Sequence, residues 1–345
     1  MGAQFSQFFP PRPTFTLADV PSQQGKIIIV TGGSSGIGLE LVNMLYSKGA
    51  TVYIAGRSES QAQAAIDQIQ ATATTTTKGQ LHYLPLHLDD LTTIKSAVET
   101  FAARETRLDL LINNAGVSQP PLGSVSAQGI ELQLATNCLG PFLFTQLLLP
   151  YLKAAAAAVA SSDSPSRPIA PRVVWTSSQV AELSAPPEGI VLSELQHPPR
   201  DAVRNYVTSK LGNWFLSVEF ARRYGSGAAS ASASASASAS SPLVSVAQNP
   251  GAANTNLLRN ARWMKLLSWP LLHKPALAAT TVLYAALAEE LDRPENNGAY
   301  VIPWGRIHPG VAPGLARHLA AEEEGGSGRA REFWEWCEER TRDYL

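Results

Sequence analysis

A glycine-rich turn near the start of the chain constrains the fold more than any other feature. The apolar run 27–30 is followed by Thr31-Gly32-Gly33-Ser34-Ser35-Gly36-Ile37-Gly38 and then by a helix-length segment. Glycines let the backbone approach a phosphate, and the first turn of a helix offers free N–H groups and its positive dipole end. Such a turn alone could be a tight loop, but between a strand and a helix it predicts a dinucleotide site. The residues expected around the phosphates are Gly32, Ser34, Ser35, Gly36, Ile37 and Gly38.

Short β-branched or apolar runs alternate with helix-length segments along most of the chain. This alternation is typical of βαβ units and of a parallel sheet with helices on both faces. The sequence therefore predicts an α/β fold, a Rossmann-type doubly wound parallel sheet in a single domain. The expected strands are residues 27–30, 51–55, 81–88, 108–112, 172–176, 243–247 and 299–302.

Three segments depart from the alternation of strands and helices. Residues 1–25 are rich in Pro, Phe and Gln and lack periodicity, so they are predicted to form an arm on or beside a domain of residues 26–306. The Ala-Ser repeat at 226–241 is predicted to be a flexible surface insertion. Residues 307–345 are expected to form a C-terminal extension that ends in an amphipathic helix.

Charge and cysteine content exclude several classes of protein. The formal net charge of -1 gives no electrostatic reason to expect a nucleic-acid partner. Cys138 and Cys337 are far apart in sequence and have no metal-ligand spacing, so we expect neither a disulfide framework nor structural zinc. We also expect no membrane-spanning helix, because no apolar run looks long enough. These features favour a reducing, cytoplasmic compartment.

The first six residues, Met1-Gly2-Ala3-Gln4-Phe5-Ser6, fit the pattern for N-myristoylation at Gly2. A chance match to so short a motif is the alternative. A single acyl chain gives only marginal, reversible membrane binding, so the expected association is weak and peripheral.

The end of the second expected strand reads Ala55-Gly56-Arg57-Ser58. Proteins that select NAD normally place an acidic residue near this point, whereas an arginine accommodates the 2′-phosphate of NADP. Gly56 leaves the acidic position empty and Arg57 supplies a cation. We therefore predict NADP(H), with an ordinary solvated arginine as the alternative.

Tyr206 and Lys210 are four residues apart, so on a helix they share one face. A tyrosine and a lysine at this spacing could be an ordinary surface pair. In this chain, however, they follow four other motifs in a fixed order. The glycine turn has the spacing T-G-x-x-x-G-x-G, and later come Asn113-Asn114-Ala115-Gly116, Thr136-Asn137-Cys138-Leu139-Gly140 and Ser177-Ser178.

Together these motifs resemble the short-chain dehydrogenase/reductase family. Residues 250–255 fit its P-G-x-x-x-T signature, and residues 297–306 are similar to the terminal strand of retinol-dehydrogenase-like and fungal members. The resemblance covers about residues 24–306. It implies further cofactor contacts, in addition to the glycine turn, from Asn113, Ala115, Gly116, Tyr206, Lys210, Pro250, Gly251, Ala253 and Thr255.

The resemblance also implies four catalytic roles. Tyr206 exchanges a proton with the substrate oxygen, Ser178 hydrogen-bonds that oxygen, and Asn137 positions a water in the proton relay; Ser177 is the alternative serine. Lys210 holds the nicotinamide ribose. A free phenol has a pKa of about 10, and a nearby ammonium favours the phenolate, so we expect Lys210 to lower the pKa of Tyr206.

One position departs from the family pattern. His87 stands where the family usually has an aspartate that contacts the adenine amino group. A neutral histidine can accept that hydrogen bond, and Asp89 can replace it if the strand end is shifted. We do not expect His87 to bind a metal, because no partner ligands are spaced around it.

The segment 257–273 is rich in Trp, Leu and Met and falls where the family has its variable substrate-binding segment. Its apolar residues favour a lipophilic ketone, aldehyde or alcohol, although core packing is an equal alternative. Trp304 either adds a wall to the substrate site or caps the sheet. The predicted function is an NADP(H)-dependent oxidoreductase, and the alternative is a catalytically silent NADP-binding sensor or scaffold.

Overall fold

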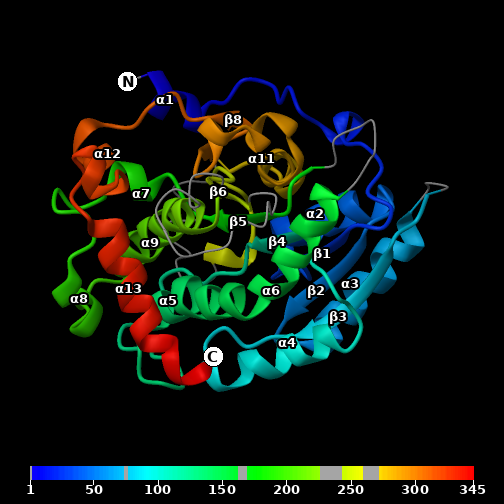
Figure 1. Ribbon diagram of the computed structural model, residues 1–345, viewed down its shortest axis with the longest axis horizontal. Coiled ribbons are helices and arrows are strands. Elements are labelled where there is room, and N and C mark those ends of the chain that lie inside the picture. The colour runs from blue at the N-terminus through cyan, green and yellow to red at the C-terminus, as the bar shows by residue number, and fades with distance from the viewer. Residues whose placement is uncertain (1, 74–76, 162–168, 226–242, 259–271) are drawn as a thin grey trace.

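The computed structural model describes residues 2–73, 77–161, 169–225, 243–258 and 272–345. Their strands form one eight-stranded sheet in the order β3-β2-β1-β4-β5-β6-β7-β8 (Figure 1). Every neighbouring pair is parallel except β7 and β8. The strands are β1 Ile27–Thr31, β2 Thr51–Gly56, β3 Gln80–Pro85, β4 Leu110–Asn113, β5 Arg172–Thr176, β6 Val244–Gln248, β7 Tyr300–Ile302 and β8 Arg306–Ile307.

The predicted doubly wound sheet is therefore confirmed, with two differences at its ends. The third strand stops at Pro85 instead of residue 88, and residues 86–88 leave the sheet to line a cavity. The two-residue β8 was not predicted; it follows a turn at residues 303–305 and pairs antiparallel with β7. The strand order reverses between β1 and β4, which places a crevice above their carboxyl ends.

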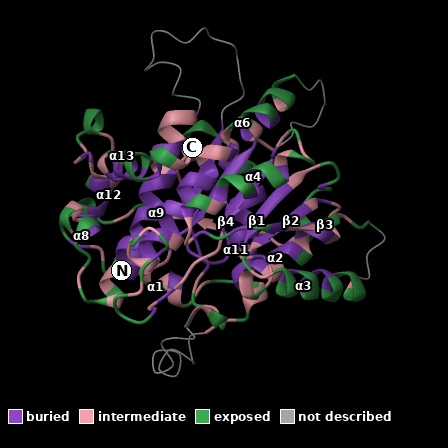
Figure 2. Cartoon of the chain, turned by 90° about the horizontal axis from the view of Figure 1, so that it is seen from below, coloured by how far each residue is buried: buried purple, intermediate pink, exposed green. Residues whose placement is uncertain are grey.

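Helices cover both faces of the sheet because alternate strand residues point to opposite sides. One face packs on α2 Gly36–Ser47, α3 Glu59–Thr72 and α11 Pro275–Leu287. The other packs on α4 Ile94–Ala102, α6 Gly140–Ala160 and α9 Ala202–Tyr224. Figure 2 shows the buried strands between α4 on one side and α2 and α3 on the other.

The expectation that no apolar run could span a membrane is wrong by length and composition. The helical stretch Leu132–Ala160 is long and apolar enough. It combines the three-residue α5 Leu132–Leu134, a π-helical segment Ala135–Leu139 and α6. Its apolar residues, among them Phe142, Leu148 and Leu152, belong to the buried core against the sheet.

Both ends of the chain pack on the domain. The first residues, expected to lack periodicity, form the helix α1 Gly2–Phe8 beside β8 (Figure 1). After β8 the chain forms α12 Pro313–Leu319 and α13 Arg329–Thr341, and α13 packs on α9. The predicted insertion at 226–241 lies outside the described residues. Two short helices, α7 Val180–Leu183 and α8 Leu192–Gln196, connect β5 to α9.

Candidate active site

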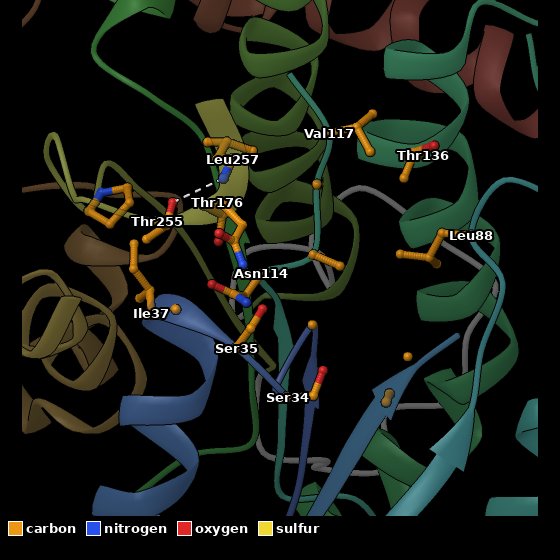
Figure 3. A pocket seen from close by; sticks show the side chains of 18 of the residues that line it. Ser34, Ser35, Ile37, Leu88, Asn114, Val117, Thr136, Thr176, Thr255 and Leu257 are labelled. Carbon is orange, nitrogen blue, oxygen red and sulfur yellow. Dashed lines mark hydrogen bonds between the residues drawn. The ribbon is translucent and has the colours of Figure 1, made fainter. Parts of the chain in front are cut away.

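A cavity of about 720 Å³ lies at the carboxyl ends of the parallel strands. Figure 3 shows Ser34 and Ser35 of the glycine turn and Ile37 of α2 on one side, and Val117 and Thr136 on the other. The cavity runs from the glycine turn to Tyr206 and Lys210 and is within the range for a small-molecule site. The predicted residues that line it are Gly32, Ser34, Ser35, Gly36, Ile37, Arg57, His87, Ala115, Gly116, Ser178, Tyr206, Lys210, Pro250, Gly251, Ala253 and Thr255.

The glycine turn has the shape that a phosphate group requires. Gly36 has φ +56° and lies against Thr255, so a side chain there would be strained and crowded. A Cβ at Gly38 would come within 2.4 Å of the Gly32 carbonyl oxygen, so Gly38 allows α2 to approach the turn although it does not itself line the cavity. Ser35, the N-cap of α2, caps no backbone N–H with its side chain within the described chain. The start of α2 is therefore free to bind an anion.

The far end of the cavity holds a charge pair that the sequence did not indicate. Arg57 Nη1 lies 3.2 Å from Asp89 Oδ2, and the Arg57 side chain is 57% exposed. His87 and Asp89 both line the cavity. Since Asp89 contacts Arg57, a carboxylate competes with any phosphate for that guanidinium. Arg57 thus supplies the predicted cation at this end of the cavity, but with Asp89 as its partner.

The turn after β4 is joined to the turn after β1 by hydrogen bonds to Thr31. The backbone N–H groups of Asn114 and Ala115 donate to Thr31 Oγ1, at 3.0 and 2.9 Å. The Asn114 side chain donates to the Thr31 carbonyl oxygen at 2.8 Å and lines the cavity. Asn113, predicted to contact the cofactor, is instead buried and donates to Thr145 Oγ1 at 3.1 Å. Asn114, and not the predicted Asn113, is therefore the member of the pair that lines the cavity.

The structure distinguishes the two serines at the end of β5. Ser177 Oγ donates to the Lys210 carbonyl oxygen at 2.7 Å and so is committed to the backbone of α9. Ser178 lines the cavity together with Tyr206, and its side chain lies close enough to lower the pKa of the phenol. Ser178 is therefore the serine placed beside the phenol.

Tyr206 and Lys210 are both buried, and burial decides their protonation. Burial raises the pKa of Tyr206 to about 12, although the Ser178 side chain lowers it. Burial lowers the pKa of Lys210 to about 8. Lys210 Nζ donates to the Thr176 carbonyl oxygen at 3.0 Å and lies 5.6 Å from the centroid of the Tyr206 ring. The expectation that Lys210 lowers the pKa of Tyr206 is therefore wrong here, because desolvation of the phenol outweighs the distant ammonium.

Asn137 lies in the π-helical segment and is 1% exposed. Its Oδ1 accepts from Val117 N at 2.8 Å, and its Nδ2 donates to Val117 O at 3.0 Å and Ser209 Oγ at 2.9 Å. Both of its N–H groups are used, and its side chain is not part of the cavity lining in the described chain. Its side chain thus joins the turn after β4 to α9 next to Lys210; the structure does not show the expected water-positioning role. Such π-helical turns are frequent at functional sites.

The turn after β6 borders the end of the cavity that holds Tyr206 and Lys210. Asn249, which the sequence did not indicate, lines the cavity and accepts the Gly251 N–H at 3.0 Å through Oδ1. Trp304 is 4% exposed, has φ 66° and packs edge-on against His273. A Cβ at Gly251 would lie 3.6 Å from Trp304 Cζ3, so the indole supports this turn from behind. Most of the apolar segment 257–273 lies outside the described residues.

A doubly wound sheet with a glycine turn at its switch point and a Ser/Tyr/Lys group at the same edge defines a dinucleotide-dependent oxidoreductase. The family model for short chain dehydrogenase matches residues 26–181. A short-chain dehydrogenase/reductase of Pestalotiopsis fici, iacJ, is 43% identical, with 97% of this chain and 96% of the relative covered. One of Phomopsis amygdali is 41% identical, with 99% and 97% covered. The chain belongs to the short-chain dehydrogenase/reductase family, whose members use nicotinamide cofactors.

Solved structures show the same fold. A protein of Mycobacterium paratuberculosis superposes with a TM-score of 0.65 at 28% identity, covering 95% of this chain and 97% of the other. The Pseudomonas aeruginosa RhlG/NADP active-site complex superposes with a TM-score of 0.56 at 24% identity, covering 82% and 95%. The second similarity concerns the fold alone.

Proposed function

We propose that the protein is an NADP(H)-dependent oxidoreductase that interconverts a lipophilic ketone or aldehyde with the corresponding alcohol. The observation that carries this proposal is the meeting of Ser178, Tyr206 and Lys210 in one cavity with the glycine turn. An oxidoreductase needs its proton donor and its dinucleotide site in one enclosed space, because hydride and proton are transferred to adjacent atoms.

The protonation states fit carbonyl reduction. A bound reduced nicotinamide supplies the hydride that reaches the carbonyl carbon. With a pKa of about 12, Tyr206 is protonated at neutral pH and can donate its hydroxyl proton to the carbonyl oxygen. Ser178, beside the same hydroxyl, can hydrogen-bond that oxygen as its charge develops. The alcohol product carries the hydride on its carbon and the proton on its oxygen. After it leaves, Tyr206 takes a new proton from solvent. Oxidation reverses each transfer.

Arg57 supports the choice of NADP(H). Its guanidinium lies at the cavity end remote from Tyr206, on the loop after β2 where the ribose 2′-substituent is recognised in such folds. A charge-assisted hydrogen bond contributes about 1.5–3 kcal/mol, but Asp89 competes for this cation. We therefore expect a tenfold to hundredfold preference for NADPH over NADH.

The apolar character of the substrate is supported by Val117 and Leu257, which line the cavity near its catalytic end. The sequence that follows Leu257 adds Trp263, Met264, Trp269 and several leucines. An apolar site with few polar groups orients its ligand through those groups, here Ser178 and Tyr206.

The test is a screen of lipophilic ketones, aldehydes and alcohols with NADPH/NADP and NADH/NAD, following absorbance of the reduced nicotinamide. Turnover with at least one carbonyl, faster with NADPH, and its loss in Tyr206→Phe would support the proposal. Tight NADPH binding with no turnover across the panel would instead favour a silent binding protein.

A further inference from the structure

The N-terminal helix α1 lies outside the residues matched by the family model, yet it contacts the active-site turns. The Gln4 carbonyl oxygen accepts from Gln179 Nε2 at 3.1 Å. Gln179 directly follows Ser178 in the sequence. Arg306 of β8 donates to the Ser6 carbonyl oxygen at 2.9 Å and to its hydroxyl at 3.1 Å. Figure 1 shows α1 beside β8. The helix is therefore held from two sides, and one of them is the catalytic edge of the sheet.

The burial pattern of α1 is the reverse of ordinary helix packing. Phe5 and Phe9, in and just after the helix, are 66% and 59% exposed, whereas Gln7 is 2% exposed. A buried amide needs hydrogen-bond partners for its oxygen and its nitrogen. The docking of α1 is thus directed by polar groups whose partners lie in the active-site turns.

Gln7 joins two turns that border the catalytic end of the cavity. Its Nε2 donates to Glu182 Oε2 at 2.7 Å, and Glu182 is four residues beyond Ser178. Its Oε1 accepts from Asn249 Nδ2 at 2.8 Å, and Oδ1 of the same Asn249 accepts the Gly251 N–H at 3.0 Å. One side chain therefore connects the turn that carries the substrate-facing serine to the turn that carries Pro250 and Gly251.

Glu182 is fixed on its other side as well. Its side chain and that of His308 are each 3% exposed, with His308 Nε2 3.3 Å from Glu182 Oε1. His308 Nδ1 accepts the Gly310 N–H at 3.1 Å, which leaves Nε2 as the ring nitrogen that faces Glu182. Burial raises the pKa of Glu182, but contacts with His308, Gln7 and Gln4 outweigh it and hold this pKa below its ordinary value.

Tyr300 completes the contacts behind the serine. Its hydroxyl donates to the Ser178 carbonyl oxygen at 3.1 Å, and its ring stacks on Trp214 at 3.7 Å. The backbone of Ser178 is thus held from β7, while the helix that follows it is held by Gln7 and His308.

We propose that Gln7 is a positioning residue: it sets the separation between the Ser178–Glu182 turn and the Asn249–Gly251 turn, and through them the place of the substrate oxygen relative to the nicotinamide. The inference rests on the proposed function and assigns a role in the reaction to a helix outside the part matched by the family model. A misplacement of about 1 Å can cost on the order of a hundredfold in rate.

The test exchanges the two ends of the Gln7–Glu182 hydrogen bond. Gln7→Glu places a second buried carboxylate against that of Glu182 and removes the N–H donor between them. The repulsion should separate the Ser178–Glu182 turn from the Asn249–Gly251 turn. The double variant Gln7→Glu/Glu182→Gln restores both hydrogen bonds. The new amide at position 182 donates to the carboxylate at position 7, and that carboxylate still accepts from Asn249. His308 Nε2 still faces the side chain at position 182. Thr16→Ala, at a half-buried N-cap in the same N-terminal arm (residues 1–25), is the matched control.

For each variant, kcat, KM, the NADPH Kd by fluorescence and the melting temperature are measured. We expect Gln7→Glu to lower kcat by roughly ten- to a hundredfold and to raise the NADPH Kd several-fold, and the double variant to recover both to within about threefold. Thr16→Ala should match the unmutated protein in kcat and Kd. If Gln7→Glu does not fold, Gln7→Met removes the same hydrogen bonds without a charge and should lower kcat by about tenfold.

Two results would overturn the inference. One is a normal kcat and NADPH Kd in Gln7→Glu or Gln7→Met, whatever happens to the melting temperature. The other is a double variant that regains its melting temperature but not its kcat. If the unmutated protein binds NADPH but reduces no carbonyl, the proposed function fails instead. In that case the NADPH Kd values of the same variants are the remaining test of the role of Gln7.

Discussion

The two ends of the cavity are built in different ways. The dinucleotide end is mostly backbone: glycines, the start of α2, and two turns joined through Thr31. The catalytic end is made of buried side chains, Tyr206 and Lys210, whose pKa values burial displaces in opposite directions. Its supports come from residues as far apart in sequence as Gln7 of α1 and His308, just after β8. Local sequence motifs indicate the residues at both ends, whereas the supports and pKa values at the Tyr206 end depend on the whole tertiary structure.

The largest expected effect separates the two ends most sharply. Tyr206→Phe removes one hydroxyl and keeps the ring that packs in α9. Turnover should fall by at least the ~10²–10⁴-fold typical of losing a general acid, while the NADPH Kd stays within about threefold. Steady-state kinetics and cofactor fluorescence measure the two quantities separately. Near-normal turnover would mean that Tyr206 is not the proton donor.

Gly38→Ala should damage the dinucleotide end. The added methyl group would come within 2.4 Å of the Gly32 carbonyl oxygen, so α2 must shift away from the turn. Overpacking of this kind costs typically 1–3 kcal/mol, and we expect a lower melting temperature and NADPH binding weakened by more than tenfold. Gly314→Ala is the matched control, because no described atom lies within 4 Å of a Cβ there. Unchanged NADPH binding in Gly38→Ala would show that the turn tolerates a wider approach.

Arg57→Ala should erase most of the tenfold to hundredfold preference for NADPH without abolishing turnover with NADH. Asp89→Asn should act in the opposite direction, because it releases Arg57 from its carboxylate partner and should increase the preference. Ratios of kcat/KM for the two cofactors test both variants. Equal or better use of NADH by the unmutated protein would contradict the assignment of Arg57.

The smallest expected effect is a dependence of cofactor affinity on pH, through Lys210 at the other end of the cavity. With a pKa lowered to about 8 by burial, Lys210 is an ammonium below that pH and neutral above it. Affinity for the anionic cofactor should therefore fall as pH rises through about 8, by up to about tenfold or ~1.4 kcal/mol. Lys210→Met should bind NADPH weakly with no such step. A step of the same size in the Met variant would assign it to another group.

Much of the sheet was predictable because buried parallel strands are short apolar runs, and the fifth, residues 172–176, was placed to the residue. β8 and α1 were missed because two and seven residues, with polar side chains among them, leave no periodic signal. The choice of Asn114 over Asn113 depends on which side chain faces the cavity. The pKa of Tyr206 was predicted in the wrong direction because its burial is a property of the folded molecule.

The position of α1 also has a consequence for how the protein is made. Ser6 is hydrogen-bonded to Arg306, 300 residues later, so α1 lacks part of its docking surface until β8 has been synthesised. Helix α9, which carries Tyr206 and Lys210, lacks a packing partner for longer still, because Phe333 of α13 packs directly against its Gly212. Chains are synthesised from the N-terminus at about 5–20 residues per second. A nascent chain of this protein can therefore form its dinucleotide turn many seconds before its catalytic edge is complete.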